Sequence, residues 1–206
     1  MRRILKIMQC FGSVYFLVIS LAVDLCVRGE VRDSTLLDTG WRYQQGDPAD
    51  AQQPVFNDAN WPVVFIPHCW GWEQAQRGRM YYRGPGWYRR GLDLGVPQPG
   101  KRYFLRFEAA SLVADVYLNG KLLGEHRGGF GAFCFEITKE LSDSGTNLLA
   151  VRVDNTRFPD IAPLSGDFSI YGGLYRPAHL IVTGEEDFAL TDHGSPGVAW
   201  LQTSVT

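Results

Sequence analysis

Residues 101–125 read KRYFLRFEAASLVADVYLNGKLLGE, and this stretch decides the fold. Every second residue from Tyr103 to Phe107 is apolar and faces one side of an extended chain, and the same period of two returns in residues 114–118. Asn119-Gly120 then precedes residues 121–125. An Asn-Gly pair favours a two-residue hairpin, because both central residues of a type I′ turn need positive φ. The stretch therefore predicts antiparallel strands.

Short runs of the same kind recur on both sides, separated by Gly, Pro, Asn and Asp. The predicted strands are residues 87–94, 132–138, 148–154 and 179–183, with weaker candidates at 41–44, 63–67 and 199–204. No segment of 12 or more residues shows an amphipathic helical stripe. The predicted fold class is all-β, an antiparallel two-sheet sandwich. The number of runs favours a jelly roll over an immunoglobulin arrangement.

Two long connections interrupt this rhythm and are candidates for function-bearing loops. Residues 67–86 are rich in Trp, Tyr and Arg, and residues 155–175 carry several Pro and Gly. Aromatic faces stack on the apolar faces of sugar rings, and Asp, Asn and Arg bind hydroxyl groups, so this mixture suits carbohydrate. Trp41, Trp61 and Trp87 lie near predicted strands and are instead expected in the core.

The first residues of the chain have the layout of a secretory signal peptide. Basic residues lie among the first six, and residues 7–23 are almost continuously apolar. We predict a signal peptide at 1–29, with cleavage after Ala22 or near Gly29, and export to the periplasm or the medium. An uncleaved anchor is the alternative, because the apolar run approaches the length of a spanning helix. After cleavage, no stable membrane span is expected.

Composition and motif searches exclude several classes of function. Twenty Lys+Arg against 22 Asp+Glu give a net charge of −2, which argues against a nucleic-acid partner. The chain has no G-x-S-x-G, C-x-x-C or H-x-x-x-H motif, and its four histidines are scattered, so neither a catalytic residue nor zinc is predicted. Residues 128–131 (GGFG) are interpreted as a turn between strands. Cys69 and Cys134 could form a disulfide in an exported protein or remain two free thiols.

Seven short motifs occur in a characteristic order. They are TGWRY at 39–43, FNDANW at 56–61, IPHCW at 66–70, GWYRR at 86–90, VYLNGK at 116–121, NLLAVRVDN at 147–155 and YGGLYR at 171–176. Together they resemble the N-terminal sugar-binding domain of family 2 glycoside hydrolases, the β-galactosidases, β-glucuronidases and β-mannosidases. The resemblance covers about residues 36–184, and each motif alone would be weak.

The resemblance implies a galactose-binding-domain-like jelly roll at residues 30–185, at the front of a longer retaining O-glycosidase that is expected to be β-galactosidase-like. In the family, an immunoglobulin-like domain and a TIM barrel with two catalytic glutamates follow. Such a barrel takes about 250 residues, and the chain contains no Asn-Glu dipeptide, which precedes the acid/base in the family. Residues 186–206 resemble a linker and the first strand of the second domain. The chain is therefore expected to be a fragment, inactive alone, with carbohydrate and the missing domains as its partners.

The resemblance also implies site residues. Asp167 matches an aspartate that, in β-galactosidases of the family, reaches the glycone subsite and assists a sodium site, so it is expected to bind substrate and metal. Tyr82 and Arg83 are further candidates for substrate binding, from the first long loop. In β-galactosidases of the family, an asparagine in this loop completes the site. Residues 80–85 (MYYRGP) contain no asparagine, which argues against β-galactosidase in particular. Arg176 is expected as an internal ion-pair or hydrogen-bond partner.

No cofactor is expected in this chain; sodium or magnesium is the candidate for a full-length enzyme. Two other functions remain open. One is a stand-alone carbohydrate-binding module, and the other is an assembly domain.

Overall fold

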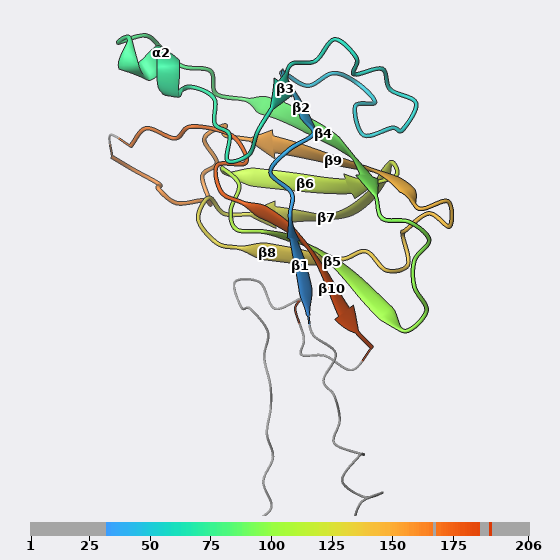
Figure 1. Cartoon of the computed structure of the whole chain (residues 1–206). Coiled ribbons are helices and arrows are strands. Elements are labelled where there is room, and N and C mark those ends of the chain that lie inside the picture. The colour runs from blue at the N-terminus through green and yellow to red at the C-terminus, as the bar shows by residue number, and fades with distance from the viewer. Residues whose placement is uncertain (1–31, 167, 186–189, 191–206) are drawn as a thin grey trace, which may run out of the picture. The chain divides into compact units, whose positions relative to one another are not determined.

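The computed structural model describes residues 32–166, 168–185 and 190. They form two antiparallel β-sheets that pack face to face as a jelly-roll sandwich (Figure 1). The four-stranded sheet has the order β1 (Asp33–Leu36), β10 (Ala178–Gly184), β5 (Lys101–Phe107) and β8 (Phe133–Glu136). The six-stranded sheet has the order β3 (Val63–Val64), β2 (Trp41–Gln45), β4 (Pro85–Asp93), β9 (Thr146–Asp154), β6 (Val113–Leu118) and β7 (Lys121–Arg127). The predicted fold class is confirmed.

The core lies between the sheets and follows from the period of two in the strands. Leu105 and Phe133 from the four-stranded sheet and Tyr88, Val116 and Val151 from the six-stranded sheet belong to one buried cluster. Each of these side chains is fully buried. Because successive residues of a strand point to opposite faces, this alternation commits one face of every central strand to the core.

The hairpin between β6 and β7 forms where Asn119-Gly120 predicts it. Asn119 has φ 53° and Gly120 has φ 85°, the positive values that a type I′ turn requires. The Asn119 side chain also accepts a hydrogen bond from the backbone N–H of Leu148, at 2.9 Å. It thereby ties the turn to the neighbouring strand β9.

Three tryptophans take the core positions expected of them. Trp41 lies between the sheets, and Trp61 and Trp87 pack with Ala51 and Ala150 on the outer face of the six-stranded sheet. The connection after β2 covers this face, and Arg89 beneath it is 2% exposed. The Nε of Arg89 donates to the Asp58 carboxylate at 2.8 Å. Two of the sequence motifs, FNDANW and GWYRR, thus meet to hold this connection in place.

Several elements differ from the sequence prediction. Strand β1 was not expected, because all four of its residues are exposed and show no alternation. The predicted strand 63–67 is reduced to Val63–Val64, and Pro67 beyond it has no N–H for a ladder. A five-residue helix, α2 (Trp72–Gln76), lies in the first long connection.

Some predictions fall where the structure gives no description. The signal peptide at 1–29, the strand at 199–204 and all of 186–206 except Leu190 lie outside the described residues, so the domain boundaries stay predictions. In the described part, no helix has the length and apolar character needed to span a membrane. Cys69 is exposed and Cys134 is buried, and no disulfide joins them.

Candidate functional site

Four connections meet at one end of the sandwich, which we call the loop end. They are residues 67–84 with α2, 108–112, 128–132 and 155–177. Isolated bridges pair Trp70 with Gly172 and Ser111 with Gly173, so three of the four connections are joined by backbone contacts. The fourth, residues 128–132, is attached by the Gly128 N–H, which donates to the Leu112 carbonyl at 2.9 Å, and by the Tyr175 hydroxyl, which donates to the Gly129 carbonyl. In Figure 1 the helix α2 and the long connection after β9 project from the same end of the sandwich.

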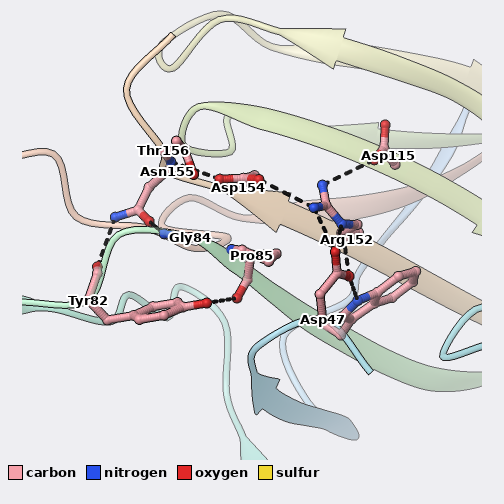
Figure 2. Close-up of polar contacts among 10 residues, drawn as sticks. Asp47, Tyr82, Gly84, Pro85, Asp115, Arg152, Asp154, Asn155 and Thr156 are labelled. Atoms are coloured by element: carbon pink, nitrogen blue, oxygen red, sulfur yellow. Dashed lines mark hydrogen bonds and ion pairs between the residues drawn. The ribbon is translucent and has the colours of Figure 1, made fainter. Parts of the chain in front are cut away.

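Asn155 joins the two long connections from inside. It is fully buried, and its Oδ1 accepts from the Gly84 N–H at 2.9 Å. Its Nδ2 donates to the Ile170 carbonyl at 2.8 Å and to the Tyr82 carbonyl at 3.4 Å. Figure 2 shows the side chain of Asn155 reaching Gly84 and Tyr82. A single amide at the end of β9 therefore satisfies backbone groups of both loops, which a purely apolar side chain could not do.

The two glycines of the YGGLYR motif are required by close packing. A Cβ on Gly172 would overlap the indole ring of Trp70, and one on Gly173 would overlap the backbone carbonyl of His68. Gly173 also has φ 127°, a conformation that side-chain-bearing residues rarely adopt. The two glycines of the motif therefore allow the second long connection to pack closely against the first.

A cavity of about 370 Å³ opens at the loop end. Three aromatic side chains, Phe130, Tyr171 and Tyr175, line it together with Cys69, Ser111, Leu112, Gly129, Ser169 and Ile170. Its volume falls within the range of small-ligand sites, and its lining is mostly apolar with a few hydroxyl groups. Such a surface offers stacking faces for a sugar ring and hydrogen-bond partners for its hydroxyls.

A polar network stabilises the adjoining outer face of the six-stranded sheet (Figure 2). Arg152 on β9 pairs with Asp47 at 2.9 Å, with Asp154 at 3.3 Å and with Asp115 at 3.6 Å. The hydrogen bond from Arg152 holds the pKa of Asp47 below its ordinary value, whereas burial raises the pKa of Asp115. Asp154 also accepts from the Thr156 N–H at 2.8 Å. The carboxylates here serve structure, because Arg152 and the start of the second loop already engage them.

The described structure brings none of the predicted site residues into the lining of this cavity. The Tyr82 hydroxyl donates to the Pro85 carbonyl at 3.1 Å, so it closes its own turn, and it does not line the cavity described above. Arg83 is exposed, and its guanidinium lies 5.9 Å from the centre of the Tyr81 ring. Asp167 lies outside the described residues, so its predicted substrate and metal contacts stay predictions. Arg176 is not an internal partner, because it is exposed and packs over the Tyr175 ring at 5.6 Å.

The described part of the loop end holds few groups suited to acid–base or metal chemistry. The Nδ1 of His68 bonds to the buried Tyr88 hydroxyl at 2.7 Å, and burial lowers the pKa of this histidine. Cys69 is exposed as a residue, but partial desolvation of its thiol raises the pKa, which disfavours the thiolate. Among residues 32–166, 168–185 and 190, no three His, Cys, Asp or Glu side chains group as a metal site would require.

Sequence reasoning missed the aromatic residues that line the cavity. The sequence analysis interprets residues 128–131, with Phe130, as a turn, and it includes Tyr171 and Tyr175 in the second candidate loop without selecting either as a site residue. The available signal was their position, since each flanks a glycine-rich turn in a connection that leaves the same end of the sandwich. Without the order of the strands, the sequence does not show which turns share an end.

The fold and cavity define a β-sandwich domain of the ligand-binding type, with its site built from loops at one end. Comparison with known proteins identifies the family to which this domain belongs. The family described as "Glycosyl hydrolases family 2, sugar binding domain" matches residues 41–184. The chain therefore belongs to glycosyl hydrolase family 2 and contains its sugar-binding domain.

Individual relatives agree with this assignment. The chain is 39% identical over 181 residues to a β-glucuronidase of Bacteroides fragilis, covering 85% of this chain and 24% of that protein. It is 33% identical over 158 residues to a β-galactosidase of Thermoanaerobacter pseudethanolicus, covering 75% of this chain and 21% of that protein. The crystal structure of a Bacteroides uniformis β-glucuronidase superposes with a TM-score of 0.74 at 42% identity, over 80% of this chain and 19% of that one. The chain thus spans about a quarter or less of the length of these relatives.

Proposed function

We propose that the chain acts as the N-terminal, non-catalytic sugar-binding domain of a longer exported glycosidase. Its loop end would supply part of the surface that holds the sugar, while the barrel expected from the family carries out hydrolysis. The observation that carries the proposal is the aromatic-lined cavity of about 370 Å³ at the loop end of a family 2 sugar-binding domain. Export is supported by the basic and apolar pattern of the first 23 residues.

For the substrate of the longer enzyme we propose a β-glucuronide, ahead of a β-galactoside. Two of the similar proteins, at 39% and 42% identity, carry the name β-glucuronidase, and a β-galactosidase follows at 33%. The sequence MYYRGP at 80–85 also lacks the asparagine that β-galactosidases of the family use. The sodium or magnesium proposed for a full-length enzyme would depend on Asp167 and on residues beyond this domain.

A chimera tests the proposal. Residues 32–185 of this chain replace the matching first domain of the Bacteroides fragilis β-glucuronidase, and hydrolysis of p-nitrophenyl β-D-glucuronide is measured. We expect a kcat/KM within about tenfold of the parent enzyme, and no hydrolysis by the 206-residue chain alone. The parent enzyme with this domain deleted is the control. A folded chimera as inactive as the deletion would contradict the proposal.

A stand-alone carbohydrate-binding module is the second candidate, and the accessibility of the aromatic surface favours it. Phe130 is 62% exposed at the cavity, and Trp72 on α2 is 51% exposed. Calorimetric titration of the chain with galactose, glucuronic acid, mannose and their oligosaccharides separates the two candidates. Saturable binding by the chain alone, together with an inactive chimera, would favour the module over the enzyme domain.

A further inference from the structure

Strand β7 ends in an arginine that contacts the second long connection. The Nη2 atom of Arg127 donates to both carboxylate oxygens of Asp160, at 2.9 Å to Oδ1 and 2.8 Å to Oδ2. The same guanidinium lies over the ring of Phe158, 5.2 Å from its centre. Both contacts fall between Asn155 and Gly172, two points at which this connection is fixed elsewhere. Arg127 therefore attaches a further part of the connection to the edge strand of the six-stranded sheet.

Phe158 links this attachment to the wall of the cavity. It packs against a buried apolar cluster made of Leu112, Val113, Ile161 and Ile170. Two members of the cluster, Leu112 and Ile170, line the cavity. Because packed side chains leave few voids, a displacement of Phe158 is transmitted to the cluster that it touches. The contacts thus run without a gap from Arg127 to the cavity wall.

The ion pair is suited to positioning a loop and contributes little to holding the fold together. The Arg127 hydrogen bond holds the pKa of Asp160 below its ordinary value. Glu125, on the same strand as Arg127, lies farther away, at 3.7 Å from its Nη1. Both Arg127 and Asp160 are exposed, so the pair adds little to global stability and is weakened by salt.

We propose that Arg127 is a positioning residue for the cavity, which acts through Asp160 and Phe158 to hold the second long connection so that Ile170 stays at the cavity wall. The inference rests on the proposed function only for its effect on hydrolysis. An arginine suits both contacts, because its charge pairs with a carboxylate while its planar face stacks on an aromatic ring.

The first test follows the Ile170 methyl signal in ¹H–¹³C spectra of the full chain labelled at its isoleucine methyl groups. Arg127→Gln should shift this signal, Asp160→Asn should shift it in the same direction, and Arg127→Lys should recover part of the shift because it keeps the charge. Lys121→Gln is the matched control, because it breaks a pair with Glu140 at 2.9 Å near the other end of β7. An unmoved signal in Arg127→Gln, or an equal shift in Lys121→Gln, would overturn the inference.

The second test measures KM and kcat for p-nitrophenyl β-D-glucuronide in the chimera. Arg127→Gln should raise KM about two- to fivefold and change kcat by less than about twofold, because the contact positions a binding surface. Adding Asp160→Asn should have no further effect, since both substitutions remove the same contact. The increase in KM should shrink as NaCl rises from about 0.05 to 0.3 M, which a purely structural role would not produce.

Urea unfolding of the chain separates positioning from folding. The midpoint should be the same in Arg127→Gln and in the parent, because the pair is exposed. A large drop in the midpoint, additive effects of Arg127→Gln and Asp160→Asn on KM, or an unchanged KM in an active chimera would overturn the inference. A folded chimera as inactive as the deletion contradicts the proposed function instead, and the Ile170 signal then decides the inference.

Discussion

Asn155 connects the two loops that form the cavity, and its replacement tests that connection. Asn155→Ala removes one acceptor and two donors from a fully buried position and leaves the Gly84 N–H and the Ile170 carbonyl without a partner. We expect a loss of about 2–4 kcal/mol in the free energy of unfolding, measured with urea. Asn60→Ala, at an exposed position, should change stability by less than about 0.5 kcal/mol. Equal effects of the two substitutions would show that Asn155 does not hold the loops.

The ion pair between Asp47 and Arg152 predicts a pH dependence of stability. The Arg152 hydrogen bond holds the pKa of Asp47 below 3.8, and a hydrogen bond from the Trp87 indole N–H adds to this effect. A depressed pKa in the folded state stabilises the protein above the unfolded value, and this stabilisation is lost as the pH falls through the folded value.

The variant Asp47→Asn should therefore be less stable than the parent near pH 6, with the difference shrinking as the pH falls below about 3.8. Asp47 is half exposed, so the effect should be small. Urea unfolding at a series of pH values measures it. Asp50→Asn is the control, because it removes the same charge at an exposed position whose positive φ asparagine tolerates. A difference that persists unchanged at low pH would contradict the assigned ion pair.

At the scale of elements, the hairpin between β6 and β7 depends on Gly120. Its φ is 85°, and a Cβ there would lie 2.8 Å from the Gln53 side-chain oxygen. Gly120→Ala should cost about 1–3 kcal/mol of stability, combining backbone strain with the displacement of that side chain. Gly91→Ala is the matched control, because Gly91 lies exposed in β4 with negative φ and open space around its Cβ position. A Gly120→Ala variant as stable as Gly91→Ala would contradict the turn assignment.

The central strands could be predicted from the sequence, whereas the exposed edge strand β1 and the short helix α2 could not. Strands β5, β6 and β9 each bury one face, so alternation reveals them. Strand β1 is exposed throughout and is defined by its pairing with β10, a long-range contact that no local pattern encodes. Helix α2 has only five residues and buries none of them, which leaves it without an amphipathic signature.

At the scale of the whole molecule, the sequence indicated which loops matter but not what they build. Tyr82 was a reasonable candidate from its composition and loop, yet its hydroxyl is bonded to Pro85. Phe130 and Tyr175 lie 45 residues apart in sequence and line the same cavity, because β7, β8 and β10 bring their connections to one end of the sandwich. A site assembled from strand order becomes visible only when the fold is known.

The central claim is that the loop end is the surface through which this domain meets the sugar. The most direct test is kcat/KM for p-nitrophenyl β-D-glucuronide in the chimera carrying Ser169→Trp, which fills the cavity, compared with Ser144→Trp at the opposite end of β9. Both serines are exposed, so neither substitution disturbs the core. We predict that Ser169→Trp lowers kcat/KM by at least about tenfold and Ser144→Trp by less than about twofold. Equal values for the two variants would contradict the claim.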